Sequence, residues 1–459
     1  MLMRAGSFTA ILILLQLTLT QESPAQLLDS MWAQYYHWSG LDVCKTSALQ
    51  SDGTILLGGE SGPSTNRQAR VACIDDVGNV IWSREYGGPG RESCNAVLPL
   101  ADGLLFAGET TSYGSGQADF WIVRCSLNGD TLWTRTFGGS SNERCYALCT
   151  GAGGGLILAG TTTTFTPGSS QFWMVKISDT GDSLWSRSFG GSGTDECYSV
   201  VRTADDGFLL AGNTTSYGAG GSDFWIVRTD SAGDSLWSRT FGGTNTDVCQ
   251  SVVAHAFGGF VLAGYTSSFG AGSYDYWVIR VSDGGDSLWS RTYGRTGIDM
   301  AHAACVDSSG NIAVAGESPI GGGYRNFRLI LLSELGDSIT TLRAGGPNDE
   351  ICYSVIALPD RSFLMSGQTY SYGPSDGNFW VFRTTPLPVV PPPESLTICV
   401  RGDSLSLRWR SAAGVVGYRV VGAPNMDGPW QTVLMTADTT AVVPMVSETG
   451  FFTVLGILQ

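Results

Sequence analysis

The chain alternates short apolar runs with turns, and one stretch in its middle shows the pattern clearly. Residues 198–201 are largely apolar, an Asp-Gly pair at 206–207 is a hairpin signal, and residues 208–212 form a second apolar run. A loop rich in Gly, Ser and Thr follows. Residues 224–228 and 235–241 then face each other across a second short turn. This pattern predicts four antiparallel strands joined by two tight hairpins and one long loop.

The same pattern recurs along most of the chain with a period of 50 to 52 residues. The second residue of a Leu-Trp pair, or its equivalent, marks each unit at Trp32, Trp82, Trp133, Trp185, Trp237, Trp289 and Thr340. Four antiparallel strands in a unit of this length are typical of a β-propeller blade. We name the strands a to d from the axis outwards, which makes the Leu-Trp strand the outermost strand, d.

The two ends of the repeat region predict how the ring closes. The last unit, which ends at 379–384, has strands a, b and c but no strand d, whereas residues 28–38 form a lone strand d. We expect these segments to pair, because closure removes open sheet edges that promote aggregation. Residues 27–385 are therefore predicted to form an all-β, seven-bladed β-propeller closed by its N-terminal strand. Its blades begin near Cys44, Cys94, Cys145, Cys197, Cys249, Ala301 and Cys352.

Three other segments flank the repeats. Residues 1–25 contain a positive charge, an apolar run at 8–19 and small residues near their end, which predicts a secretory signal peptide. A retained N-terminal anchor is the alternative. Residues 386–394 are rich in proline and predict a stiff linker, and residues 395–459 predict a small β-sandwich-like domain. We expect the mature chain to be secreted or to lie in the cell envelope, without a transmembrane segment.

The repeat units resemble a known family. Residues 184–191, 211–216 and 222–228 resemble the SBBP and related delta-60 repeats of bacterial seven-bladed propellers. The resemblance covers roughly residues 28–385 and implies an exported or envelope-associated protein, in a family that no activity characterises. Tryptophan on strand c, in place of the more usual aliphatic residues, departs from the family pattern.

The C-terminal segment has a resemblance of its own. Residues 395–459 are similar to a fibronectin type III module in Trp409, in Tyr418 and in the final aromatic strand at 451–454. The segment has about 65 residues. Sandwiches of this kind have ~100 residues. We therefore expect it to have fewer strands than a full module.

The charge of the chain excludes some partners. The formal net charge is −15, and lysine occurs only at Lys45 and Lys176. Such a surface repels phosphate backbones and anionic lipid, so we expect no nucleic-acid partner and no electrostatic docking to membranes. The expected state is a monomer with an extracellular protein or glycan as its partner.

Six of the eleven cysteines begin the strands a named above. Equivalent positions on neighbouring blades point the same way round the ring, so symmetry does not favour disulfides between them. We interpret these cysteines as small buried residues that pack between blades. A thiol metal site is the functional alternative and requires ligands that converge.

An acidic residue stands two positions before each of these seven strand starts. The seven are Asp42, Glu92, Glu143, Asp195, Asp247, Asp299 and Glu350. In a structural interpretation, each accepts backbone N–H bonds in its loop or pairs with an arginine of strand d. The arginines available are Arg84, Arg135, Arg187, Arg239 and Arg291. In a binding interpretation, the acids form a channel mouth that collects cations, Ca²⁺ among them, or a basic partner.

Aromatic residues stand at one position of the b–c loop in five blades. They are Tyr113, Phe165, Tyr217, Phe269 and Tyr372, and the first and sixth blades have Gly62 and Ile320 instead. The predicted topology puts the b–c and d–a loops on one face and the tight hairpins on the other. The aromatics either stack on sugar rings or clamp a peptide on that face, or they cover the junction between blades.

The sixth blade departs most from the pattern. It has Ala301 at the cysteine position, Arg295 in place of the second glycine and Arg328 in place of the strand-c tryptophan, with His302 close by. These changes have two alternative explanations: sequence drift, or a specific binding site on this one blade. Arg295 and His302 are the candidate binding residues of such a site.

Catalytic motifs are weak. The three histidines, at positions 37, 255 and 302, are not equivalent, so they indicate neither a triad nor a metal cluster. The sequence favours a non-catalytic exported scaffold or recognition protein that presents its loop face to a glycan, a peptide or an envelope partner. The alternative is a polysaccharide hydrolase or lyase that uses loop-face carboxylates such as Asp299 and Glu317.

Overall fold

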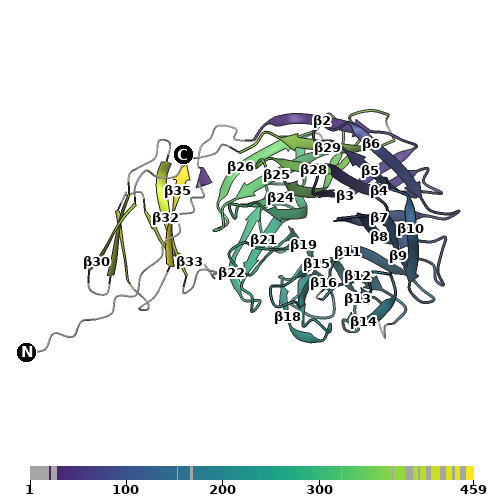
Figure 1. The fold of residues 1–459 in the computed structure, drawn as a ribbon, viewed down its shortest axis with the longest axis horizontal. Coiled ribbons are helices and arrows are strands. Elements are labelled where there is room, and N and C mark those ends of the chain that lie inside the picture. The colour runs from purple at the N-terminus through teal and green to yellow at the C-terminus, as the bar shows by residue number, and fades with distance from the viewer. Residues whose placement is uncertain are drawn as a thin grey trace, which may run out of the picture.

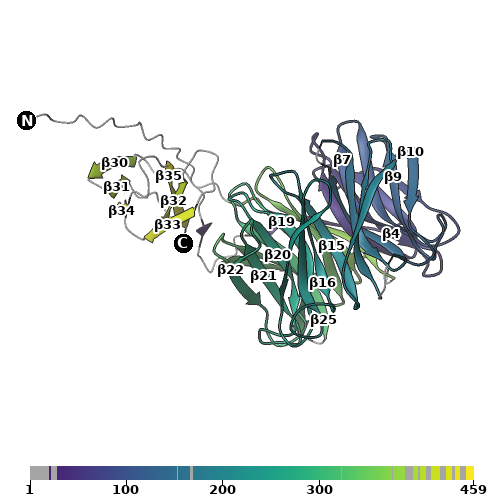
Figure 2. The same ribbon diagram turned by 90° about the horizontal axis from the view of Figure 1, so that it is seen from below.

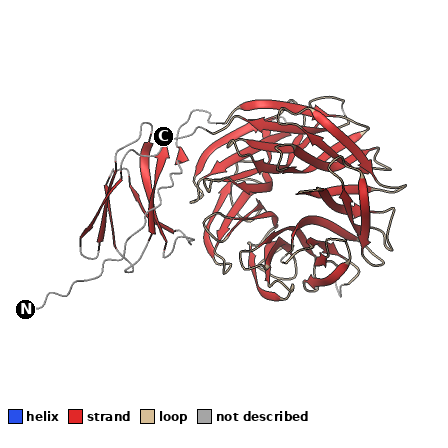
Figure 3. Ribbon diagram, in the orientation of Figure 1, coloured by secondary structure: helices blue, strands red, loops and turns tan. Residues whose placement is uncertain are grey.

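The computed structural model describes residues 28–387, apart from 152, 166–168, 322 and 375, and the backbone of seven further strands nearer the termini. Seven four-stranded antiparallel sheets stand round a central axis as the blades of a propeller (Figure 1). All the regular secondary structure of the described residues is β-strand (Figure 3). The prediction of an all-β, seven-bladed propeller is confirmed. Among the same residues, no helix is long and apolar enough to cross a membrane.

The first four blades follow the chain from strand a to strand d. Blade 1 comprises β3 (Leu41–Leu49), β4 (Ile55–Gly62), β5 (Gln68–Ile74) and β6 (Val80–Tyr86). Blade 2 comprises β7 (Glu92–Leu100), β8 (Gly103–Thr110), β9 (Asp119–Cys125) and β10 (Thr131–Phe137). Blade 3 comprises β11 (Glu143–Thr150), β12 (Leu156–Thr162), β13 (Gln171–Ile177) and β14 (Ser183–Phe189). Blade 4 comprises β15 (Asp195–Arg202), β16 (Phe208–Thr214), β17 (Asp223–Thr229) and β18 (Ser235–Phe241).

The last three blades complete the ring. Blade 5 comprises β19 (Asp247–Ala254), β20 (Phe260–Thr266), β21 (Asp275–Val281) and β22 (Ser287–Tyr293). Blade 6 comprises β23 (Met300–Val306), β24 (Ile312–Gly321), β25 (Tyr324–Leu332) and β26 (Ser338–Ala344). Blade 7 comprises β27 (Glu350–Ala357), β28 (Phe363–Thr369), β29 (Asn378–Thr384) and β2 (Ser30–Tyr36).

Strand β2, from the start of the propeller, supplies the fourth strand of blade 7. It pairs antiparallel with β29, with Tyr35 opposite Trp380 and Trp32 opposite Arg383. The Thr385 N–H donates to the carbonyl of Asp29 at 2.7 Å, which extends the pairing beyond the strands. The predicted closure of the ring by residues 28–38 is therefore confirmed.

The blades pack face to face through strands b and c. In blade 4 every residue of β16 and β17 is buried, whereas β18 is mostly exposed, because the inner strands are covered by blades on both sides. On strand c, the ring of Phe172 contacts that of Trp225 with centroids 4.5 Å apart, and Phe224 contacts Trp277 in the same way at 4.5 Å. The Phe-Trp pair joins neighbouring blades in this way at four of the seven junctions.

The C-terminal residues form two further sheets. Strands β30 (Leu396–Arg401), β31 (Ser404–Trp409) and β34 (Thr440–Pro444) make one sheet. Strands β32 (Val415–Ala423), β33 (Gln431–Thr436) and β35 (Phe451–Leu458) make the other, with β1 (Thr20–Gln21) parallel to β35. In Figure 2 strands β30–β35 lie outside the ring of blades. Of the predicted linker, residues 386 and 387 are described, and Leu387 is buried in the propeller core with its N–H donating to the Arg361 carbonyl at 3.1 Å. Residues 388–394 and the rest of the predicted signal peptide lie outside the described residues.

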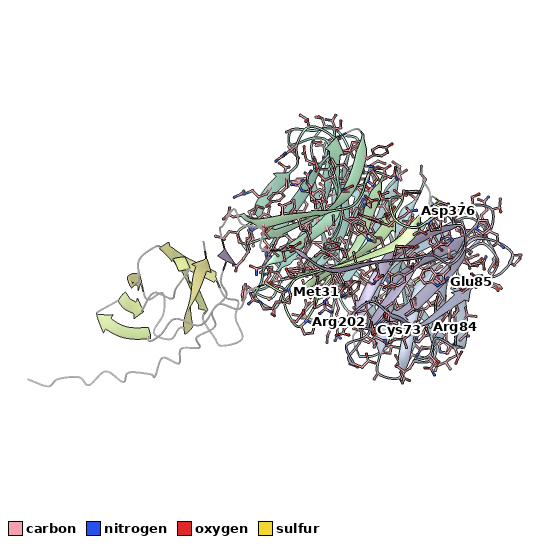
Figure 4. The ribbon with its side chains drawn as sticks, turned by 90° about the horizontal axis from the view of Figure 1, so that it is seen from above. Met31, Cys73, Arg84, Glu85, Arg202 and Asp376 are labelled. Atoms are coloured by element: carbon pink, nitrogen blue, oxygen red, sulfur yellow. The ribbon has the colours of Figure 1, made fainter. Side chains whose placement is uncertain are left out.

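Leu28 is the residue through which closure is best tested. It is fully buried in a core shared with blades 6 and 7, whereas Met31, labelled in Figure 4, is 51% exposed on β2. We expect Leu28→Ala to lower the free energy of unfolding by about 2 to 5 kcal/mol, and Met31→Ala to change it by less than about 0.5 kcal/mol. Denaturant unfolding measures both. Equal effects of the two substitutions would contradict the described closure.

Candidate functional site

The seven acidic side chains at the starts of the a strands are fully buried. Each carboxylate accepts a hydrogen bond of 2.8 to 3.1 Å from the backbone N–H four residues earlier. The donors are Trp38, Gly88, Gly139, Gly191, Gly243, Arg295 and Gly346. In six blades a hydroxyl of strand b also donates to the acid, from Thr110, Thr162, Thr214, Thr266, Ser318 or Thr369. Each acid therefore holds the preceding d–a loop against its own blade.

The described residues do not show the other structural possibility, in which these acids pair with arginines of strand d. Arg84 lies 3.8 Å from Asp130, and Arg187 lies 3.0 Å from Asp234, and both of these aspartates are exposed. Strand d is the outermost strand of a blade and the acids begin the innermost strand, so strands b and c separate the two groups.

In blades 1 and 6 a side chain from outside strand b approaches the acid. Strand c of blade 6 carries Arg328 in place of tryptophan, and its guanidinium lies 2.8 Å from Asp299. In blade 1 the ring of His37 lies 3.1 Å from Asp42. These two blades lack the Thr-x-Ser/Thr loop sequence of the others, and in blade 6 the charge of Arg328 stands in for the loop hydroxyl and N–H groups found elsewhere.

The acids are consequently not an open ring around the channel mouth. Each of them is fully buried and already accepts at least one hydrogen bond inside the protein, although Asp42 Oδ1 has no partner among the described residues, and each lies in a different blade. Among the residues that the structure describes, no group of three or more His, Cys, Asp or Glu side chains is placed to hold a metal ion. The described cysteines form no disulfides. The six that begin the a strands are fully buried, as predicted for packing residues.

The five loop aromatics stand on the same face as the d–a loops, and we call them the aromatic rim. Each ring stacks on the strand-c tryptophan of its own blade, with centroids 5.2 to 6.1 Å apart. The three tyrosine hydroxyls donate to carbonyls of the d–a loop at Gly87, Gly190 and Gly345. The rim residues therefore cover the blade junctions, yet each remains 38% to 50% exposed. In blade 6 the equivalent Ile320 is 40% exposed.

Of a set of residues that line the central channel, one from each blade, the sequence analysis named only His302 as a candidate binding residue. They are Lys45, Asn95, Tyr146, Tyr198, Gln250, His302 and Tyr353, and we call them the channel layer. Each directly follows the cysteine that begins its strand a, or Ala301 in blade 6. At each of these residues the pairing register between strands a and b shifts by a bulge. Such a bulge redirects a side chain, here towards the axis. A Cβ at Gly212 of β16 would lie 1.9 Å from the carbonyl oxygen of Glu196, so the bulge requires glycine opposite it.

The channel layer lines a cavity of about 530 Å³. Around it, Lys45 donates to the side chain of Asn95 at 3.2 Å, and the rings of Tyr146 and Tyr198 meet edge to face at 5.2 Å. The repeat contains a signal for this site. The position after the register cysteine changes its chemistry from blade to blade, whereas the positions around it are similar in most blades.

A cluster of four charged residues lies at the edge of this cavity, and we call it the cationic cluster. Glu60, at the end of β4, is 3.6 Å from Lys45, 2.8 Å from Arg67 and 3.0 Å from Arg91. Burial raises the pKa of Glu60, but the charges of Lys45, Arg91 and Arg67 outweigh it and leave that pKa below its ordinary value. The cluster therefore has two more positive than negative charges.

The sixth blade places two more titratable groups by the channel. Burial raises the pKa of Glu317 to about 7, although Arg325 lies 2.6 Å from it and opposes the rise. Burial, aided by the charge of Arg325, lowers the pKa of His302 to about 4, so its ring is neutral at pH 7. Arg295 takes part in the d–a loop through its backbone N–H, and its side chain is exposed. Of the two candidate binding residues Arg295 and His302, only His302 lines the cavity.

Comparison with known proteins assigns no family to the chain. No protein-family model and no curated protein matches the chain. Among solved structures, Sqt1 from Chaetomium thermophilum is 13% identical over 83% of this chain and 97% of its own, with a TM-score of 0.44. The β-propeller domain of the Trilobed protease from Pyrococcus furiosus is 8% identical over 79% and 97%, with a TM-score of 0.38. The chain is a seven-bladed β-propeller protein.

The role of the buried acids is tested in blade 4. Asp195 accepts hydrogen bonds from the Gly191 N–H and from the hydroxyls of Thr214 and Ser216. We expect Asp195→Asn to lower the free energy of unfolding by about 2 to 4 kcal/mol, because the amide replaces an acceptor by a donor. Asp182→Asn, in an exposed turn, should change it by less than about 0.5 kcal/mol. A difference of less than about 1 kcal/mol between the variants would contradict the structural role.

The raised pKa of Glu317 predicts a pH dependence of stability. Between its ordinary value of 4.5 and about 7 the folded protein binds a proton that the unfolded chain does not bind. This contribution to stability is complete below pH 4.5 and is lost as the pH rises through 7. We therefore expect the melting temperature of Glu317→Gln, relative to the parent protein, to increase between pH 5 and pH 8. The control is Glu85→Gln on the outer strand, and parallel pH profiles for Glu317→Gln and the parent protein would contradict the assignment.

Proposed function

We propose that this chain is an exported, non-catalytic recognition protein that binds a glycan on the loop face of its propeller. The aromatic rim is the observation that carries the proposal. Its five side chains stand at equivalent positions on one face, and each leaves 38% to 50% of its surface exposed. Aromatic rings in such positions pack against the C–H faces of sugar rings while a tyrosine hydroxyl stays available to polar neighbours.

The rim is also held in place before any ligand arrives. Each ring rests on a buried tryptophan, and three of the five are tied to a loop carbonyl through their hydroxyls. Little side-chain freedom remains to be lost on binding, which favours affinity. Blades 2 to 5 carry rim residues in succession, so the ligand that suits this arc is a chain of sugar units rather than a single ring.

Export is part of the proposal and rests on the sequence. Residues 1–25 have the composition of a signal peptide, and the repeats resemble the SBBP type found in exported proteins. Strands β30–β35 form two sheets of a sandwich-like module that resembles fibronectin type III in its sequence. In this proposal the module is a spacer or a second contact.

We propose that the protein binds the glycan without cleaving it by hydrolysis or elimination. Asp299 is fully buried and bonded to Arg328 and Ser318, and Glu317 is buried beside Arg325. Both carboxylates are buried beside an arginine, so neither is exposed to a ligand on the loop face.

A glycan array followed by titration calorimetry with the best ligand tests the proposal. The double variant Tyr217→Ala, Phe269→Ala removes two neighbouring rim rings and should weaken binding at least about tenfold. Leu236→Ala is the control, since this leucine is 56% exposed on the outer strand β18 and away from the loop face. Unchanged affinity of the double variant would contradict the proposal, and release of reducing ends from the ligand would overturn its non-catalytic part.

A further inference from the structure

The central cavity has a lining suited to a sugar unit. Three of the seven channel-layer residues are tyrosines, at positions 146, 198 and 353, and two are amides, Asn95 and Gln250. Aromatic rings and amides together provide stacking faces, donors and acceptors around one space. The volume of about 530 Å³ is within the range of small-molecule sites. Arg67 of the b–c loop also lines the cavity, which places its opening on the face that carries the aromatic rim.

One side of this cavity is positively charged, although the chain as a whole has a net charge of −15. Lys45 and Arg67 both line it, and the single carboxylate beside them, Glu60, is shared with Arg91. Glu60 cannot saturate the hydrogen-bond donors of three cations. The Nε of Arg67 is buried and has no hydrogen-bond partner among the described residues.

Blade 6, two blades from Lys45 round the ring, also brings an unused polar atom to the cavity. His302 lines it, and its Nε2 is buried without a hydrogen-bond partner in the part of the chain that the structure describes. Buried polar atoms of this kind are uncommon in folded proteins and call for a partner. Tyr353 lies against the His302 ring with centroids 5.5 Å apart, so an aromatic surface adjoins the free nitrogen.

We propose that the central cavity binds the carboxylate-bearing unit of an acidic sugar. Lys45 and Arg67 bind the carboxylate, the tyrosines contact the faces of the ring, and the amides and His302 bind its hydroxyls. Guanidinium groups bind carboxylates with two parallel hydrogen bonds, which favours this anion over a neutral hydroxymethyl group at the same position. The inference rests on the proposed function, since it makes the cavity the end site of a glycan that the rim binds, and it specifies an acidic glycan.

Titration calorimetry of the full chain with paired monosaccharides tests the proposal. The pairs are D-glucuronate with D-glucose and D-galacturonate with D-galactose, because each pair differs at one carbon. We expect one acid to bind at least about tenfold more tightly than its neutral partner, a difference of about 1.4 kcal/mol. Equal affinity within both pairs overturns the proposal. Acetate should not compete at the same concentration, and competition by acetate overturns the assignment of a sugar.

Two substitutions in the cationic cluster are expected to act in opposite directions. Lys45→Met removes a cation and should weaken binding of the acid at least about tenfold. Glu60→Gln removes the internal competitor for the same cations and should strengthen it about threefold or more. Arg135→Gln, on the outer strand β10, is the control for charge and should change nothing. A purely structural cluster predicts that both substitutions weaken binding, and that result overturns the proposal.

Failure of this proposal is distinguishable from failure of the proposed function. Binding of an oligosaccharide that requires Tyr217 and Phe269, without any effect of Lys45→Met, overturns the acidic-sugar site and leaves the recognition function intact. If no glycan binds the folded parent protein, the recognition function and the acidic-sugar site fail together. Thermal unfolding of each variant shows whether it is folded before its affinity is compared.

Discussion

The structure depends on a carboxylate that is buried at the start of every innermost strand. A buried carboxylate without hydrogen-bond donors is strongly destabilising, so each of the seven must be surrounded by donors. The donors come from the preceding d–a loop and, in six blades, from strand b of the same blade. Long glycine-rich segments that would otherwise be loose are therefore held at fixed positions on one face. The acids also accept hydrogen bonds from the b–c loops, for example from the Ser112 N–H and the Ser216 hydroxyl, so the loops that carry the aromatic rim are anchored too.

The first and sixth blades satisfy the same requirement with different chemistry. Arg70 and Arg328 occupy the strand-c position that holds tryptophan elsewhere, and the guanidinium of Arg328 contacts the acid of its own blade. The planar guanidinium also replaces the lost ring in packing, since Arg328 lies over Tyr276 at 5.2 Å from the ring centroid. These are the two blades without an aromatic residue in the b–c loop. The rim tyrosines and phenylalanines stack on tryptophan, so losing the tryptophan removes the support that such a residue uses.

The sequence was sufficient to predict the ring of seven blades and its closure, and insufficient to predict the channel. The period of the Leu-Trp pair and the missing strand of the last unit determine the topology without any knowledge of side-chain contacts. Which residues face the axis depends on the bulge after each register cysteine, and a bulge breaks the alternation from which strand faces are inferred. Residues such as Lys45 and His302 were therefore not recognised as one layer. Of the two structural possibilities for the acids, the structure shows hydrogen bonds from backbone N–H groups and not pairing with arginines of strand d, because two strands lie between those groups.

The buried acids fix the loops on one face of the propeller, and the amides of those loops report on it directly. Hydrogen–deuterium exchange of the Gly139, Gly191 and Gly243 amides measures whether they are bound, since each donates to an acid at 2.8 to 2.9 Å in a loop between blades. The account predicts protection comparable to that of amides within the strands. Exchange of these glycines at the rate of free loops would contradict it.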